Sequence, residues 1–157
     1  MLKNFRTTFP SSRDPASHPC PFESEPNLLK QPMTVLKVPD PQQVYDAEMD
    51  DGAVIRLRRH GNPARPRAIL SHGNGLAING YFPYWRLLLD DFDVVVFDFR
   101  NSGENPVHGG DHGYDRFLRD LTTIYDAIDR QFGEKRQLGI FHSMSSRANL
   151  KYALDGN

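Results

Sequence analysis

The sequence predicts an α/β fold, in which an antiparallel hairpin is followed by parallel strands with flanking helices. From residue 44 onward, short apolar or alternating runs take turns with longer stretches of helical periodicity. One of these runs, residues 94–97, is apolar without interruption, which is typical of a parallel strand buried on both faces. The order of the elements therefore indicates a sheet that begins antiparallel and continues parallel.

Five strands are expected, at residues 44–49, 53–58, 68–70, 93–99 and 137–141. The first two flank Asp50, Asp51 and Gly52, which form a turn signal between two strand-like runs. These two strands are therefore expected to pair as a hairpin. The other three are separated by helical segments, as in a parallel sheet.

Three helices are expected, at residues 81–89, 114–132 and 146–154. Pro83 falls in the first turn of the first helix, where its missing N–H is tolerated. The second helix carries one apolar stripe and is terminated by Gly133. A loop rich in glycine and asparagine, residues 101–113, precedes this second helix.

Composition excludes several classes of partner for this chain of 157 residues. Lys plus Arg is 19 and Asp plus Glu is 20, so a net charge of −1 gives no reason to expect nucleic acid as partner. No apolar run is long enough to span a membrane, and the N-terminus lacks the apolar stretch of a signal peptide. Cys20 is the only cysteine, so an intrachain disulfide is impossible. We expect a soluble, cytoplasmic protein.

The chain divides into an N-terminal arm, residues 1–41, and a domain, residues 42–157. Eight of the 12 prolines fall in the arm. Proline removes a backbone donor and disfavours helix in the residue before it, so no regular element of useful length fits there. The arm is either a loose leader, or a strap across the domain or partner-binding segment.

The strongest candidate for chemistry is Ser143, in the run Phe141-His142-Ser143-Met144-Ser145. A sharp turn between a strand and a helix lifts a serine hydroxyl clear of the backbone, as in the pattern G-x-S-x-G. Ser145 supplies the small residue after the nucleophile, but Phe141 stands where the preceding glycine is usual and is expected to crowd the turn. The alternative is that Ser143 merely caps the helix.

Acyl transfer also needs at least two donors aimed at the developing oxyanion, each worth about 3–4 kcal/mol. The backbone amide of Met144 is one candidate, because it directly follows the nucleophile. The second is the amide of Asn74, in the glycine-containing loop after the third strand. His72 in the same loop is interpreted as structural, with its ring holding the loop by a hydrogen bond.

Three ordered motifs resemble the first half of the α/β-hydrolase fold family. They are Leu70-Ser71-His72-Gly73-Asn74-Gly75, Asp98-Phe99-Arg100-Asn101-Ser102-Gly103 and Phe141-His142-Ser143-Met144-Ser145. They are similar to the family's HG oxyanion loop, its D-x-R-G-H-G-x-S segment and its G-H-S-M-G elbow. The departures are Asn101 and Ser102 for Gly-His, and Phe141 and Ser145 for glycines. The resemblance implies a serine hydrolase acting on an ester or amide, similar to lysophospholipases and serine aminopeptidases, without cofactor or metal.

The triad of that family runs in the order Ser, then Asp or Glu, then His. After Ser143 the chain offers one acid, Asp155, and no histidine. The chain is therefore expected to be an inactive half of such an enzyme, with an incomplete sheet whose nucleophile strand is an open edge. The alternative is a non-catalytic α/β fragment. In either case the edge could pair with a second copy or with a C-terminal half.

Other motifs receive structural interpretations. The residues from His108 to His112 fit no standard zinc spacing. Gly73-Asn74-Gly75 fails as a dinucleotide fingerprint because Ile78 stands where the third glycine is needed. Asp98, within Asp98-Phe99-Arg100, is interpreted as half of a structural ion pair.

Overall fold

The structure is a computed structural model that describes residues 36–156. The arm expected over residues 1–41 thus lies mostly outside the described residues. Its last six residues, 36–41, form neither helix nor strand, and Val38 packs against the apolar core.

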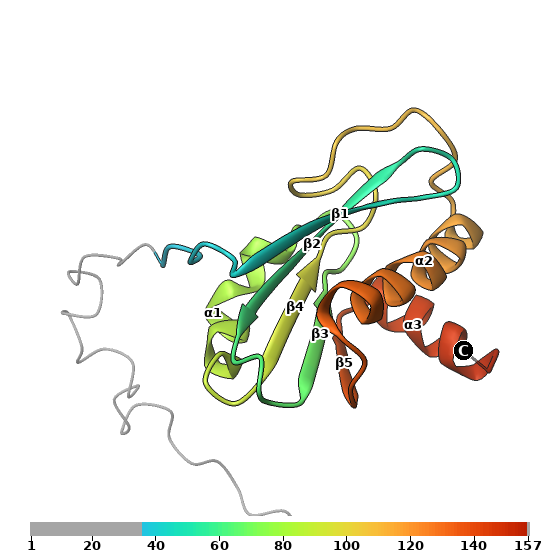
Figure 1. Cartoon of the computed structure of the whole chain (residues 1–157). Coiled ribbons are helices and arrows are strands. Elements are labelled where there is room, and N and C mark those ends of the chain that lie inside the picture. Colours follow the sequence, from blue (N-terminus) through green and yellow to red (C-terminus); the bar gives the residue numbers. More distant parts are fainter. Residues whose placement is uncertain (1–35, 157) are drawn as a thin grey trace, which may run out of the picture. The chain divides into compact units, whose positions relative to one another are not determined.

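The five expected strands form one sheet in the order β1-β2-β4-β3-β5 (Figure 1). Their bounds are β1 Gln43–Glu48, β2 Val54–Gly61, β3 Arg67–Ser71, β4 Asp93–Phe97 and β5 Gln137–Phe141. β2 is antiparallel to both β1 and β4, whereas β3 is parallel to both β4 and β5. This confirms a sheet that begins antiparallel and continues parallel.

The hairpin turn forms at Gly52, which has a φ of 83° and donates its N–H to the carbonyl of Met49 over 3.0 Å. A positive φ costs glycine no side-chain clash, so the turn closes without strain. The fourth strand stops at Phe97, two residues earlier than expected. Asp98 and Phe99 instead begin the loop and make the contacts described below.

Two of the three expected helices form with nearly the predicted bounds. α2 spans Tyr114–Phe132, as expected, and α3 spans Met144–Leu154, starting two residues early and directly after Ser143. The helix expected over residues 81–89 was wrong in its extent. It is replaced by the 3-10 turn Ile78–Tyr81, a single α turn, α1 Phe82–Trp85, and the 3-10 turn Arg86–Leu88.

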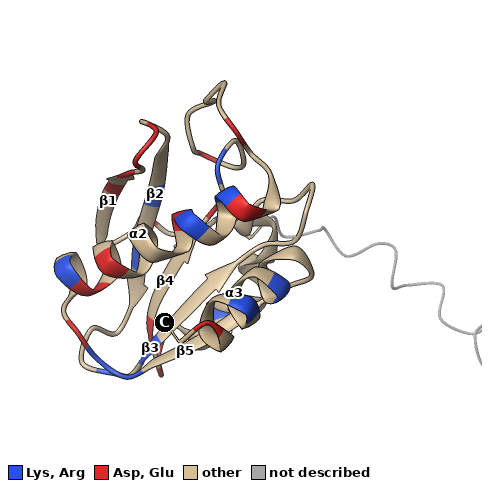
Figure 2. Ribbon diagram, turned by 90° about the vertical axis from the view of Figure 1, so that its right-hand side faces the viewer, with Lys and Arg blue, Asp and Glu red and all other residues tan. Residues whose placement is uncertain are grey.

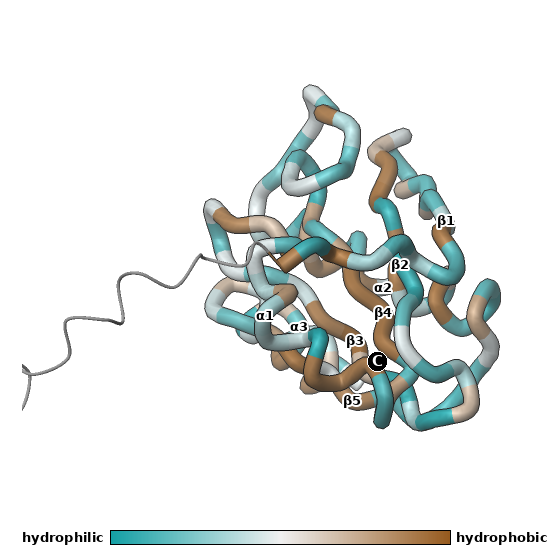
Figure 3. The backbone as a smooth tube through the Cα atoms, turned by 90° about the vertical axis from the view of Figure 1, so that its left-hand side faces the viewer, coloured by the Kyte–Doolittle hydropathy of each residue, from teal (hydrophilic) through white to brown (hydrophobic). Residues whose placement is uncertain are grey.

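The sheet is covered by α2 and α3 on one face and by α1 with its 3-10 turns on the other (Figure 1). Alternate residues of β4 serve the two faces: Val95 and Phe97 pack towards α2, whereas Val94 and Val96 pack against the cluster that contains Trp85. All five residues of β4 are buried, as the continuous apolar run predicted. Figure 3 shows this apolar stretch of chain in the middle of the domain.

A buried ion cluster closes the end of the sheet at which β3 and β4 begin. The carboxylate of Asp93, which is 0% exposed, accepts hydrogen bonds from Arg59 at 2.6 Å and from Arg67 at 3.1 Å, and Lys135 lies 3.1 Å away. Burial would raise the pKa of Asp93, but the hydrogen bonds from Arg59 and Lys135 and the charge of Arg67 hold it below its ordinary value.

A second set of charged side chains, Arg58, Asp98, Arg100, Arg116 and Asp120, is also buried. Figure 2 shows residues of both signs along α2. Within residues 36–156, no helix combines the length and the apolar character that crossing a membrane requires.

Candidate active site

Ser143 lies on the turn between β5 and α3, with a φ of 55° and a ψ of −112°. A non-glycine residue at positive φ is strained by about 1–3 kcal/mol, and such strain is common at functional sites. Ser143 is exposed, and its side chain makes no capping hydrogen bond to α3. The geometry therefore gives no support to the helix-cap interpretation and is that of a serine lifted out of a strand-to-helix turn.

Ser145 stabilises this turn from inside. Its side chain is 0% exposed, and its hydroxyl accepts the N–H of His142 over 3.0 Å. The same hydroxyl lies 3.0 Å from the carbonyl of His142 and 3.4 Å from that of Ser71, at the end of β3. Ser145 thus fits the space of the usual glycine and adds hydrogen bonds within the turn.

Phe141 does not crowd the turn as the sequence suggested. Its ring folds back along its own strand and lies over Gly139, where a Cβ atom would come within 2.4 Å of the ring. Residues two apart in a strand share a face, so a glycine at 139 makes room for a phenylalanine at 141. Compared with the G-x-S-x-G pattern, which places a glycine at position 141, the glycine of β5 thus lies two residues earlier, at position 139.

The loop after β3 lies beside this turn. A Cβ at Gly73 would come within 2.6 Å of His142 Nδ1 and 3.4 Å of Ser143 Cβ, so the close approach requires glycine. Asn74, the next residue, and Met144 line one cavity of about 360 Å³, together with Tyr114 and His112. Asn74 and Met144 therefore border a common space, and the convergence of their backbone amides on one oxyanion stays a prediction.

His72 holds the loop, as the sequence predicted. The ring is 1% exposed, and Nε2 accepts the N–H of Phe99 over 3.1 Å. Nδ1 then carries the hydrogen and donates it to the carbonyl of Gly73 over 2.7 Å. With both nitrogens engaged, His72 is a structural residue.

Asp98 is half of a structural ion pair, but its partner is not the nearby Arg100. It pairs with Arg58 of β2 over 3.1 Å, and its other oxygen accepts the N–H of Ile78 over 2.7 Å. Arg100 pairs instead with Asp120 of α2 over 2.7 Å and with Asp51 of the hairpin turn over 2.9 Å. The hydrogen bonds that Arg100 donates to Asp120 and then to Asp51 raise the pKa of Arg100 further, so it stays charged.

Asn105 is a further loop anchor, which the sequence reasoning missed. It is 8% exposed, and its amide donates to the carbonyls of Asp98 and Phe99 over 2.7 and 3.0 Å, while its oxygen accepts the N–H of Arg56 over 2.8 Å. Its place in a polar loop gave no signal that it would be buried.

None of the described histidines is shown within hydrogen-bond distance of the Ser143 hydroxyl. His142 bonds to Tyr81 through Nδ1, and His108 lies 3.7 Å from Asp51. His112, on the cavity wall, places Nδ1 3.3 Å from the carbonyl of Gly110. Among residues 36–156, no group of three or more metal-ligating side chains is close enough to hold a metal ion.

Comparisons with known proteins support the fold. No family model and no curated protein sequence matches the chain. Among solved structures, a hydrolase from Pseudomonas aeruginosa is similar with a TM-score of 0.62 and 22% identity, over 73% of this chain and 42% of that one. An α/β hydrolase from Sphaerobacter thermophilus gives 0.59 and 24%, over 71% and 40%. A carboxylesterase from Bacillus subtilis gives 0.60 and 12%, over 73% and 39%.

The chain has the α/β-hydrolase fold. It spans less than half the length of each of these three proteins. Within that fold, Ser143 lies at the end of the strand next to the open side of the sheet, and the loop with Asn74 follows the neighbouring strand β3.

Proposed function

We propose that this chain is the nucleophile-bearing part of a serine hydrolase that cleaves a carboxylic ester or amide through an acyl-enzyme. The observation that carries the proposal is the exposed Ser143 at a positive φ between β5 and α3. The similarity to a carboxylesterase from Bacillus subtilis supports the ester class. A cytoplasmic location is part of the same proposal.

In the reaction, Ser143 Oγ attacks the carbonyl carbon while a base takes the hydroxyl proton. The bond from this carbon to the alcohol oxygen or amine nitrogen breaks, and the leaving group receives the proton. Water then attacks the acyl group, which restores the serine hydroxyl and releases the carboxylic acid. The amides of Asn74 and Met144 would stabilise the oxyanion in both steps.

The base is not identified among the described residues, because none of the described histidines is shown within hydrogen-bond distance of the Ser143 hydroxyl. A serine hydroxyl is a poor nucleophile without an imidazole beside it. The chain alone is therefore expected to show little or no esterase activity, although donors and binding can leave roughly 10³–10⁴-fold acceleration over water.

Chemical rescue tests the proposal on the chain as it is. The full chain is incubated with p-nitrophenyl butyrate, with and without free imidazole as a substitute base, and is then analysed by mass spectrometry. We expect one butyryl group on Ser143, formed faster with imidazole and missing in Ser143→Ala. Ser102→Ala, which alters a serine that lines the cavity beside Asn74 and Met144, serves as the matched control and should leave acylation unchanged.

Acylation that is the same in wild type and Ser143→Ala, or no acylation with imidazole, would contradict the nucleophile assignment. Rapid turnover without imidazole that Ser143→Ala abolishes would show a base within the chain. In that case His112→Ala identifies or excludes the exposed histidine that shares the cavity with Asn74 and Met144, because the other histidine on the wall, His72, is buried with both ring nitrogens hydrogen-bonded.

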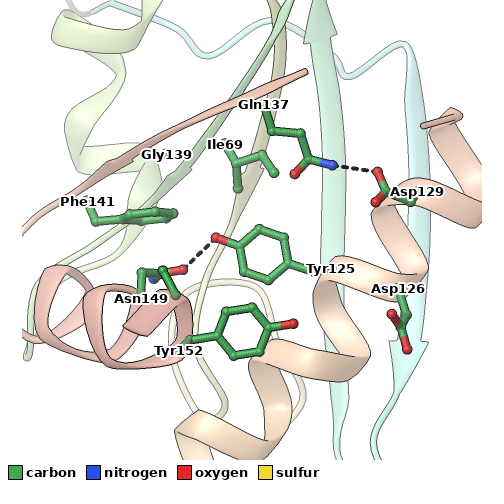
Figure 4. A pocket seen from close by; sticks show the side chains of 10 residues that line it. Ile69, Tyr125, Asp126, Asp129, Gln137, Gly139, Phe141, Asn149 and Tyr152 are labelled. Atoms are coloured by element: carbon green, nitrogen blue, oxygen red, sulfur yellow. Dashed lines mark hydrogen bonds between the residues drawn. The ribbon is translucent and has the colours of Figure 1, made fainter. Parts of the chain in front are cut away.

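A second candidate function, an interaction module, is favoured by the open side of the sheet. Within residues 36–156, β5 pairs with β3 alone. Leu138 on β5 and Leu150 and Leu154 on α3 are 50%, 63% and 75% exposed. A cavity of about 450 Å³ lies beside this edge. On its wall, Tyr125 donates a hydrogen bond to Asn149, and Tyr152 lies next to Tyr125 (Figure 4). We propose that this edge binds a second copy of the chain or the remainder of a hydrolase domain. Sedimentation velocity of the chain alone would show whether it binds a second copy or stays a monomer.

A further inference from the structure

The Tyr81 hydroxyl lies between the two segments that form the candidate site. The backbone N–H of Gly73, in the loop after β3, donates to Tyr81 Oη over 3.3 Å. On the other side, Tyr81 Oη is 2.7 Å from Nδ1 of His142, the residue before Ser143. One side chain therefore connects the loop that carries Asn74 to the turn that carries Ser143 and Met144.

The backbone of Tyr81 is itself well fixed. Tyr81 ends the 3-10 turn Ile78–Tyr81, and Ile78 is 1% exposed. The N–H of Ile78 is bound by Asp98, and its carbonyl accepts a hydrogen bond from the buried Trp85 over 3.2 Å. The hydroxyl is thus presented from a rigid support rather than from an exposed loop.

Gly73 can only donate, so Tyr81 Oη accepts from it. The hydroxyl also has one hydrogen to donate, and the arrangement that uses it directs this hydrogen to His142 Nδ1, 2.7 Å away. Nδ1 then acts as an acceptor, and the neutral ring carries its hydrogen on Nε2. The basic lone pair of His142 is consequently occupied by Tyr81 and turned away from use by the Ser143 hydroxyl.

We propose that Tyr81 is a positioning residue, which holds the Asn74 loop against the Ser143 turn and keeps His142 in the Nε2–H tautomer. The catalytic consequence rests on the proposed function, because it requires that Asn74 and Met144 stabilise an oxyanion. The hydrogen-bond chain through Tyr81 and the tautomer of His142 do not depend on the proposed function. A displacement of one donor by about 1 Å can lower a rate about 100-fold, so a connection between the two donor segments matters for the reaction.

The test combines one measurement that needs no reaction with one that does. Nitrogen-15 NMR of the full chain at about pH 8.5, two units above the ordinary histidine pKa, reports the tautomer of His142. Amide hydrogen exchange reports the Gly73 N–H. The variant is Tyr81→Phe, and the matched control is Tyr84→Phe, which alters a tyrosine that is 55% exposed. Imidazole-rescued acylation of Ser143 is the second readout.

In wild type and Tyr84→Phe we expect His142 as the Nε2–H tautomer and a protected Gly73 amide. In Tyr81→Phe we expect a tautomer mixture, Gly73 exchange about five- to tenfold faster, and acylation about 10- to 100-fold slower. A wild-type ring that is already mixed or Nδ1–H, or a Tyr81→Phe ring that stays Nε2–H, overturns the proposal. Acylation unchanged in Tyr81→Phe overturns the positioning role, whereas no acylation even in wild type refutes the proposed function and leaves the NMR result standing.

Discussion

β4 and β5 flank the same strand, β3, in the same parallel register, yet they differ fully in burial. Ala68 of β3 pairs with Val94 on one side and with Leu138 on the other. Val94 is 0% exposed and Leu138 is 50% exposed. Both residues are apolar and lie in strands, so the difference comes from what lies beyond each strand. β4 has β2 as its outer neighbour, and β5 has none within the described residues.

This comparison teaches that the stable part of the domain and the candidate site are not the same part. The side of the sheet with β2 and β4 carries the buried ion cluster and most of the apolar core. The turn that carries Ser143 follows β5, the edge strand that has only β3 as a neighbour among the described residues. Substitutions on the β4 side should therefore cost much more stability than substitutions on the β5 side.

The largest effect is expected for Asp93→Asn. Arg67, which is 0% exposed, would lose its buried carboxylate partner and keep only Asp129 at 3.5 Å and two backbone carbonyls as acceptors for its buried charge. We expect the free energy of unfolding to fall by about 3–5 kcal/mol in urea denaturation. The control, Asp155→Asn, removes the exposed pair with Lys151 and should cost less than about 0.5 kcal/mol. Similar losses in both variants would contradict the comparison.

The next effect is a pH dependence from His60 on β2. Burial, and then the charge of Arg58, lowers the pKa of His60 from 6.5 to about 4. Above pH 6.5 the ring is neutral in both folded and unfolded chain. Below it the unfolded chain takes up a proton first, so the free energy of unfolding should fall by about 2 kcal/mol by pH 5.

His60→Phe should remove that part of the pH dependence, whereas His112→Ala, at an exposed position, should retain it. The measurement is urea denaturation followed at pH 5 and pH 7. If the free energy of unfolding of His60→Phe still falls between pH 7 and pH 5, the pH dependence comes from another group.

A smaller effect is expected for Gly139→Val on β5. The new side chain would overlap the Phe141 ring and should cost about 1–3 kcal/mol of stability. The double variant Gly139→Val with Phe141→Leu removes the overlap with the ring and keeps an apolar side chain against the core, so it should recover most of this loss. Gly109→Ala, which meets no atom within 4 Å, is the control. Thermal unfolding of the four proteins provides the comparison, and no recovery in the double variant would mean that the two positions are independent.

The smallest effect on stability is expected for Leu138→Lys. The side chain is already half exposed, so the free energy of unfolding should change by less than about 0.5 kcal/mol. A charge on an open edge strand disfavours strand pairing between molecules, so any self-association should decrease. Val107→Lys, at a position that is 90% exposed in a loop, should leave association unchanged. Sedimentation velocity measures both, and a large loss of stability would show that this edge is covered.

The sequence predicted the strands and α2 because burial on one or two faces leaves a periodic pattern. It failed over residues 81–89, where Phe82, Trp85, Leu88 and Leu89 have helical spacing but only one α turn forms between 3-10 turns. Periodicity reports which side chains are buried and does not fix the backbone hydrogen bonds that bury them.

At the candidate site, the order of strand, Ser143 and helix was sufficient to predict the turn. The partner of Asp98 was not predictable, because Arg58 is 40 residues away in the sequence and reaches Asp98 only through the pairing of β2 with β4. The direction of the Phe141 ring was also hidden, since it depends on a side-chain conformation that no spacing rule fixes.

The position of the glycine in β5 has a consequence for how such turns are recognised. Here the glycine lies at position 139, under the Phe141 ring, and the small residue after the nucleophile is Ser145, whose buried hydroxyl is hydrogen-bonded within the turn. The turn thus forms although neither glycine of the G-x-S-x-G pattern is present. A sequence search for that pattern alone would pass over this chain.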